Sequence, residues 1–184
     1  SLGVALVHTG RLEEAIAHYR QAVAQTPQYA EAFNNLGEAF AAKGDDKEAI
    51  AYFEKATRLG ATYATAHANL GMMLARTGQS KRAIPPLRKV VELKPEDAEA
   101  RRNLGHALAE NGDFKEAVVQ LEKADKLTGG QDPLTVHLLG KVYADLSRIP
   151  EAISAERRAL KLAVEQNNPM LVQSIREHVD QLTR

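Results

Sequence analysis

A short pattern that recurs at a fixed spacing limits the folds open to this chain more than any other feature. The tripeptide Asn35-Leu36-Gly37 returns as Asn69-Leu70-Gly71 and as Asn103-Leu104-Gly105, so the glycines lie 34 residues apart (71 − 37 and 105 − 71). Weaker copies are centred on Gly3 and Gly140. A constant period of this length indicates one structural unit that is copied along the chain and packs against its neighbours.

Each copy has the hydrophobic pattern of two helices. In the second copy Phe33, Leu36 and Phe40 follow the spacing of an amphipathic helix, and Phe53 belongs to a second such pattern. A second glycine separates the two patterns, and Gly44 in this copy suits a helix C-terminus followed by a tight turn. The first glycine lies inside a helix, where it costs about 1 kcal/mol relative to alanine. We therefore expect its small size to permit close helix packing.

These motifs resemble the tetratricopeptide repeat. The second copy reads Ala30-Glu31-Ala32-Phe33-Asn34-Asn35-Leu36-Gly37, followed by Gly44-Asp45 and Glu48-Ala49, although the tryptophan usual early in the repeat is absent. The resemblance covers about residues 1–166 in five copies and implies an all-α solenoid of antiparallel helix pairs, wound into a right-handed superhelix. We predict a single array over 1–184, made of a partial repeat 1–29, repeats 30–63, 64–97, 98–132 and 133–166, and a capping helix 168–183.

Two copies depart from the pattern. Pro85 and Pro86 fall within the second helix of the third copy. Because proline lacks an N–H and crowds the preceding turn, they predict a bend or a late helix start, unless they lie close enough to the first turn to be tolerated. In the fifth copy Glu156 stands where a bulky apolar residue is usual.

Charge and motif content argue against several classes of function. The 24 basic and 24 acidic side chains balance, which disfavours nucleic acid or an anionic membrane as a partner. No apolar run approaches the roughly 20 residues of a membrane helix, so we predict no membrane insertion. There is no cysteine and no phosphate-loop, His-Glu-x-x-His or Gly-x-Ser-x-Gly motif, so we predict neither an enzyme nor a cofactor. His106 and His137 could face one another on neighbouring first helices, but no third ligand is evident and we predict no metal site.

The resemblance also implies a ligand-binding groove. In this family the first helix of each pair lines the concave face, with its second, fifth, sixth, ninth and twelfth residues directed inward. On that basis we predict a peptide-binding groove lined by Asn35, Asn69, Asn103, Asn34, Glu38, Met72, Arg102, His106, His137 and Lys141.

Asn35, Asn69 and Asn103 hold the same place in three successive repeats. A carboxamide has two donor hydrogens and an acceptor oxygen, so a row of them can bond the backbone of an extended peptide. Such a row resembles the asparagine ladder in the superhelix of O-GlcNAc transferase. The alternative is that asparagine is common at this position in the family and that these amides bond only to helix backbone nearby.

We therefore predict a protein–protein interaction scaffold that holds an extended peptide or a helix of a protein partner in its concave groove. Two alternatives remain open. One is a non-catalytic, substrate-recruiting segment of a larger enzyme such as a glycosyltransferase. The other is a self-assembling module, in which Leu2 and Leu6 of an uncapped first helix make end-to-end contact with another copy. The sequence does not specify the compartment.

Overall fold

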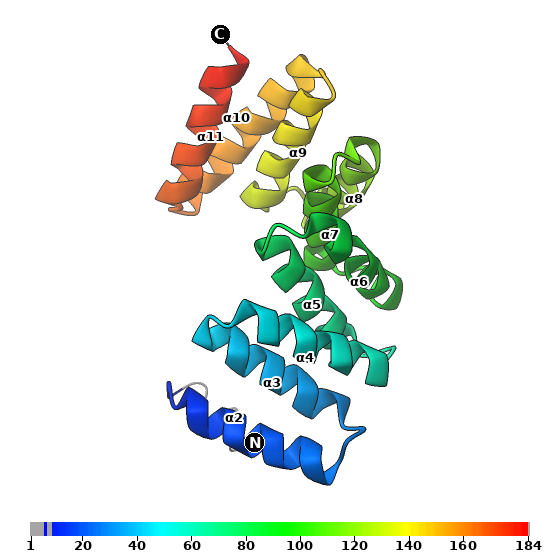
Figure 1. Cartoon of the computed structure of the whole chain (residues 1–184). Helices are drawn as coiled ribbons and strands as arrows, with labels where there is room; N and C mark the ends of the chain where they lie inside the picture. The colour runs from blue at the N-terminus through cyan, green and yellow to red at the C-terminus, as the bar shows by residue number, and fades with distance from the viewer. Residues whose placement is uncertain (1–5, 7–8, 184) are drawn as a thin grey trace. The chain divides into compact units, whose positions relative to one another are not determined.

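The computed structural model describes residue 6 and residues 9–183, and helix is the only regular secondary structure among them (Figure 1). The chain divides into two compact units, Ser1–Lys94 and Pro95–Arg184. This boundary lies close to the predicted junction between repeats 64–97 and 98–132.

Unit 1 is built from successive helix pairs. Its helices are α2 (Leu12–Gln25), α3 (Ala30–Lys43), α4 (Asp46–Leu59), α5 (Ala64–Arg76) and α6 (Ser80–Leu93). α3 packs with α4 and α5 with α6, while α2 covers α3 and α4 covers α5. α3 and α5 begin at the residues where the predicted repeats begin. Leu2, and with it most of the first helix predicted for end-to-end contact, lies outside the described residues.

Unit 2 continues the same scheme. Its helices are α7 (Ala98–Glu110), α8 (Phe114–Leu127), α9 (Pro133–Asp145), α10 (Ile149–Glu165) and α11 (Pro169–Leu182). α7 packs with α8 and α9 with α10, and α11 covers α10 and contacts α9. α11 occupies the segment predicted as a capping helix. Its start is fixed by Asn168, whose side chain accepts a hydrogen bond from the Leu171 N–H at 3.1 Å.

The glycines inside the first helices lie where paired helices touch. A Cβ built on Gly71 would stand 2.5 Å from Cγ of Leu87, and one on Gly37 would stand 2.5 Å from the ring of Phe53. Both distances are far shorter than the ~3.5–4.0 Å at which carbon atoms attract. The prediction that small residues permit close packing is therefore confirmed.

The turn between paired helices uses the left-handed backbone region. Gly44 has φ +86° and its N–H bonds to the carbonyl of Ala41, which ends α3 as the sequence predicts. In the fifth pair Ser147 takes the same place with φ +59°, a conformation that disfavours any residue with a Cβ.

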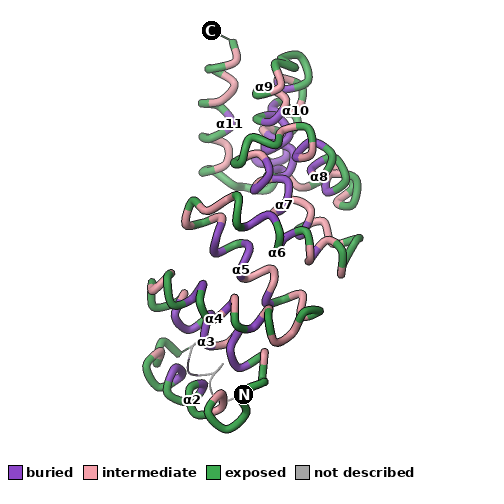
Figure 2. Tube along the Cα trace, turned by 45° about the vertical axis from the view of Figure 1, so that its right-hand side comes forward, coloured by how far each residue is buried: buried purple, intermediate pink, exposed green. Residues whose placement is uncertain are grey.

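The apolar core runs along the seams between helices, where Leu36, Leu87, Leu104, Leu108 and Leu121 are fully buried. Figure 2 shows buried stretches, in purple, on helices of both units. α6 begins at Ser80 and continues through Pro85 and Pro86, so a late helix start at the prolines is wrong. Across the described residues, no helix has both the length and the apolar character needed to cross a membrane.

Candidate functional site

The first helices of unit 1 carry a hydrogen-bonded group of polar side chains. Asn69 Nδ2 on α5 donates to Asn34 Oδ1 at 3.0 Å and to Glu38 Oε1 at 2.9 Å, both on α3. Asn34 Nδ2 also donates to Glu38 Oε1 at 2.9 Å. The amide hydrogens of Asn69 are thus used inside the protein, and its Oδ1 is the atom left to accept from a ligand.

Asn35 and Asn103 differ from Asn69 although they share its place in the repeat. Both are half-buried, and neither side chain bonds to any residue that the structure describes. Asn69 differs because the preceding repeat offers it the oxygens of Asn34 and Glu38. For Asn103 the corresponding residues are Ala68 and Met72, which have no side-chain oxygen. Within the described part of the chain, the amides of Asn35 and Asn103 therefore have both donors and the acceptor unused.

Acidic and aromatic side chains surround this group. The hydroxyl of Tyr29, a residue that is 45% exposed, donates to Glu31 Oε2 at 3.1 Å. Burial raises the pKa of Tyr63 above its usual value, and the charges of Glu31 and Glu38 raise it further. Neither carboxylate forms an ion pair with a described residue. We call Tyr29, Glu31, Asn35, Glu38, Tyr63 and Asn69 the acidic surface of unit 1.

A small pocket of about 240 Å³ adjoins the acidic surface. Phe53, Met72 and Met73 supply its apolar lining, and Glu38 and Asn69 stand at its polar side. Met72 is 41% exposed, so this part of the predicted groove offers apolar surface to a partner. Arg76 also lines the pocket, but its guanidinium is held by Asp46.

In unit 2 the predicted basic residues are largely engaged within the protein. Arg102 Nη1 lies 2.9 Å from Asp132 Oδ2, and His106 Nε2 lies 3.8 Å from Glu110 Oε1. Burial lowers the pKa of His106 below its usual value, although Glu110 opposes this effect. Lys141 is exposed. Of the basic groups predicted to line the groove on α7 and α9, only Lys141 lacks an ion-pair partner within the described chain.

Asp132, which the sequence analysis missed, links two elements of unit 2. Its carboxylate caps α9 by accepting from the Leu134 N–H at 3.2 Å and the Thr135 N–H at 3.3 Å. Burial alone would raise its pKa, but the hydroxyl of Thr135 and the Arg102 guanidinium outweigh it, so the pKa lies below its usual value. The signal in the sequence was Asp132-Pro133, because Asp followed by Pro at the first helical position is typical of a helix start.

Two predicted groove residues are buried instead. Asn34 is 1% exposed and bonded to Glu38 and Asn69, and His137 is 5% exposed and bonded to Glu156. Both side chains are turned into the protein, where polar partners satisfy them: Glu38 on α3 and Asn69 on α5 for Asn34, and Glu156 on α10 for His137. They leave the candidate groove set. His137 also approaches a carboxylate, and not the His106 partner considered from the sequence.

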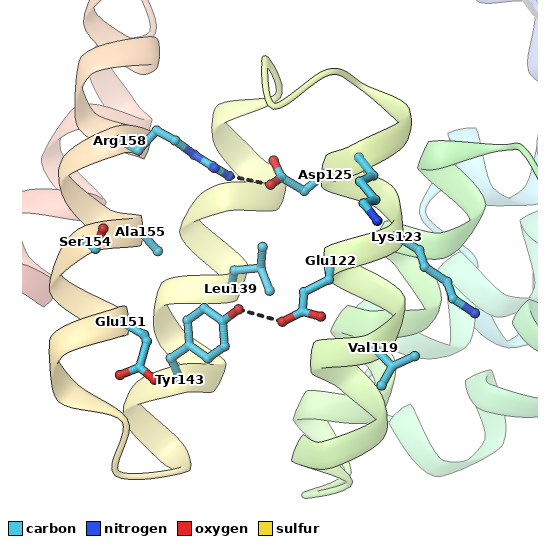
Figure 3. Close-up of a pocket in the computed structure, with 11 residues that line it drawn as sticks. Val119, Glu122, Lys123, Asp125, Leu139, Tyr143, Glu151, Ser154, Ala155 and Arg158 are labelled. Atoms are coloured by element: carbon cyan, nitrogen blue, oxygen red, sulfur yellow. Dashed lines mark hydrogen bonds and ion pairs between the residues drawn. The ribbon is translucent and has the colours of Figure 1, made fainter.

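A larger pocket of about 620 Å³ lies among α8, α9 and α10, with Val119, Leu139 and Ala155 in its apolar lining (Figure 3). The Tyr143 hydroxyl donates to Glu122 at 2.8 Å, and Arg158 reaches from α10 to Asp125 on α8. Burial and the bond to Glu122 raise the pKa of Tyr143 to about 12.

This pocket is not on the predicted groove, because its wall is formed largely by the second helices α8 and α10. Its central tyrosine and arginine are committed to partners inside the protein. The acidic surface of unit 1, although beside a smaller pocket, has two carboxylates without an ion-pair partner and the Asn35 amide without a hydrogen bond among the described residues. Chemistry, more than volume, therefore favours the acidic surface as the candidate site.

Helix pairs that repeat along a chain and pack on their neighbours define the class of α-solenoids. Models of the tetratricopeptide repeat match residues 3–44, 30–62, 49–95 and 68–130. The chain belongs to the tetratricopeptide repeat family.

Solved structures show the same fold. YrrB, described as a tetratricopeptide repeat protein with an unusual peptide-binding site, is 28% identical with a TM-score of 0.83, over 95% of this chain and 88% of that one. MamA from Desulfovibrio magneticus is 23% identical with a TM-score of 0.82, over 91% and 94%. No curated protein sequence matches the chain. The family and the similarity to YrrB support a protein–protein interaction scaffold in general, of a kind that is typically non-catalytic.

Proposed function

We propose that this chain is a non-catalytic scaffold that binds an extended peptide of a protein partner on the acidic surface of unit 1. The observation that carries the proposal is the pair of carboxylates on α3, Glu31 and Glu38, which have no ion-pair partner in the described chain. Asn35, whose amide bonds to no residue that the structure describes, lies on the same helix. Carboxylates of this kind attract Lys or Arg side chains, and the amide can bond the peptide backbone.

The expected ligand follows from these groups. A basic side chain would approach Glu38 or Glu31, where the exposed ring of Tyr29 can also contact a cation. An apolar side chain next to it would enter the pocket formed by Phe53, Met72 and Met73. The peptide binds by combining charge with one apolar anchor, and no bond is made or broken. YrrB, similar over 95% of this chain, is described as having a peptide-binding site, which supports a peptide as the ligand class.

A displayed library of random peptides, selected on the purified chain, tests this function. Selected sequences should be enriched in Lys or Arg beside an apolar residue. Their affinity, measured by fluorescence polarisation, should fall as salt rises, because exposed charges are screened. Selection of peptides without basic residues, or affinities that do not respond to salt, would contradict the proposal.

Three variants locate the binding surface. Glu38→Gln removes the charge but leaves an oxygen that can accept from Asn34 and Asn69, and it should weaken binding about fivefold, as expected for one ion pair. Asn35→Ala should weaken binding roughly tenfold through a lost pair of backbone hydrogen bonds. Glu48→Gln is the matched control, because Glu48 is exposed on the second helix α4 and should leave affinity unchanged. Equal affinity for all three folded variants would refute the surface.

A further inference from the structure

The helix pair of the fifth repeat, formed by α9 and α10, contains a buried carboxylate where the pairs of the three preceding repeats have an apolar side chain. Glu156 lies at the place of Phe53, Leu87 and Leu121, sixteen residues after the packing glycine (156 − 140, as in 53 − 37). It is fully buried, and a Cβ on Gly140 would stand 2.5 Å from its Oε1. A carboxylate in this position is costly unless other groups compensate its charge.

Two histidines from different helices converge on this carboxylate. His137 Nδ1 on α9 lies 3.0 Å from Oε1 and 2.8 Å from Oε2 of Glu156, and His178 Nδ1 on α11 lies 2.6 Å from Oε1. One ligand atom from each of the three residues lies within 4.8 Å of the others. His137 is buried, while the His178 side chain is 16% exposed. Three helices thus direct two imidazole nitrogens and a carboxylate oxygen at one point.

We propose that His137, Glu156 and His178 bind a divalent transition-metal ion, most favourably Zn²⁺, which fastens α11 to the fifth helix pair. Two imidazoles and one carboxylate form a donor set that Zn²⁺ uses, with a fourth position left for water. Mg²⁺ and Ca²⁺ are hard cations that prefer oxygen ligands, so a site with two nitrogen ligands does not suit them.

The geometry allows an ion with a small adjustment. Zn²⁺ binds nitrogen and oxygen at about 2.0–2.2 Å, so ligand atoms in a tetrahedral site stand about 3.3 Å apart. The contacts of 2.6–3.0 Å between the histidines and Glu156 would have to lengthen by about 0.3–0.7 Å to reach that separation. The partly exposed side of His178 provides the entry path.

The surroundings of the three residues suit a metal site. Ser174 Oγ lies 3.3 Å from Nε2 of His137, so it can accept the ring N–H when Nδ1 binds the ion. Such an outer partner fixes the orientation of a ligating histidine. Nearby, an apolar cluster holds α11 in place, formed by Val136, Ala159, Leu162, Ala163 and Ile175. It keeps water away from one side and strengthens the attraction between ion and carboxylate.

Metal binding is tested on the whole chain after treatment with a chelator and dialysis. Isothermal titration with Zn²⁺ should show one ion per chain, and Co²⁺ should give the visible absorption of a tetrahedral site. Hydrogen exchange of the α11 amides should slow when Zn²⁺ is added, because the ion binds the folded state only. This last measurement tests whether the ion fastens the capping helix.

His178→Ala is the main variant, since its side chain lies nearest to solvent and its loss disturbs the core least. It should weaken Zn²⁺ binding by about 100-fold or more, because loss of an outer partner alone costs 10–100-fold. His106→Ala is the matched control and should bind like the wild type. Circular dichroism checks that each variant is folded. Absence of Zn²⁺ binding by the folded wild type, or unchanged binding in His178→Ala, would overturn the proposal.

Discussion

Replacing Gly71 by alanine tests whether packing against Leu87, and not helix propensity, is the reason that α5 contains a glycine. Alanine favours a helix by about 1 kcal/mol over glycine. Its Cβ, however, would stand 2.5 Å from Cγ and 2.6 Å from Cδ2 of Leu87. Cγ is a branch point near the helix, and Leu87 is fully buried, so the side chain has little room to move. Overpacking of this kind costs about 1–3 kcal/mol. After the helix gain of about 1 kcal/mol, we expect Gly71→Ala to lower the free energy of unfolding by up to about 2 kcal/mol.

A second substitution reverses the sign of the effect. Leu87→Ala alone should cost about 2–5 kcal/mol, because it opens a cavity in the core. In that background the new Cβ at position 71 meets no Leu87 atoms, so Gly71→Ala should stabilise by up to about 1 kcal/mol. Gly78→Ala is the control: its φ of +73° disfavours alanine, but no atom lies within 4 Å of the added Cβ. Its cost should therefore be the same in both backgrounds.

Denaturation in urea, followed by circular dichroism, measures these differences. Midpoint and slope are compared for the wild type, the single variants and the double variants. The packing argument is refuted if Gly71→Ala stabilises the wild type, or if it destabilises the protein equally with and without Leu87.

Three further predictions use the same assay. Ser147→Gly should stabilise the protein by about 0.5–1 kcal/mol because φ is +59° there. Ser154→Gly inside α10 should instead cost about 0.5 kcal/mol, since glycine is less favourable than serine in a helix, and equal effects of the two substitutions would contradict the account of the turn. Asp132→Ala should lower the free energy of unfolding by about 1–2 kcal/mol, which is more than Asp97→Ala, a substitution that removes only a cap. The pKa of Asp132 is lowered in the folded state. The stability that Asp132 contributes should therefore be fully present above about pH 4 and disappear as pH falls through the folded pKa. Burial lowers the pKa of His67, so the wild type should lose stability relative to His67→Gln as pH falls below its ordinary value of 6.5, and parallel pH curves would exclude this effect.

The repeat made the helices and their packing predictable from sequence. Gly71 and Leu87 recur at fixed places in each copy, so their contact follows from period and residue size. The path of α6 through Pro85 and Pro86 was harder to predict, because it depends on whether the core holds a helix that lacks two backbone hydrogen bonds.

The candidate site was only partly predictable. The register places Asn35, Asn69 and Asn103 equivalently, but whether each amide is free depends on the residues of the preceding repeat, which the register does not fix. The unusual Glu156 was visible in the sequence. Its contact with His178 was not visible, because the capping helix has no equivalent in the other repeats and the repeat register therefore does not predict how it packs.

Chemical-shift mapping by NMR tests the central claim most directly, with a library-selected basic peptide titrated into the isotope-labelled chain. The account predicts that the largest backbone shifts fall on α3 and α5 around Asn35, Glu38 and Asn69. With Glu38→Gln the same shifts should require about five times more peptide, whereas Glu48→Gln should titrate like the wild type. Shifts concentrated instead around Val119 and Tyr143, in the pocket of α8, α9 and α10, would contradict the account.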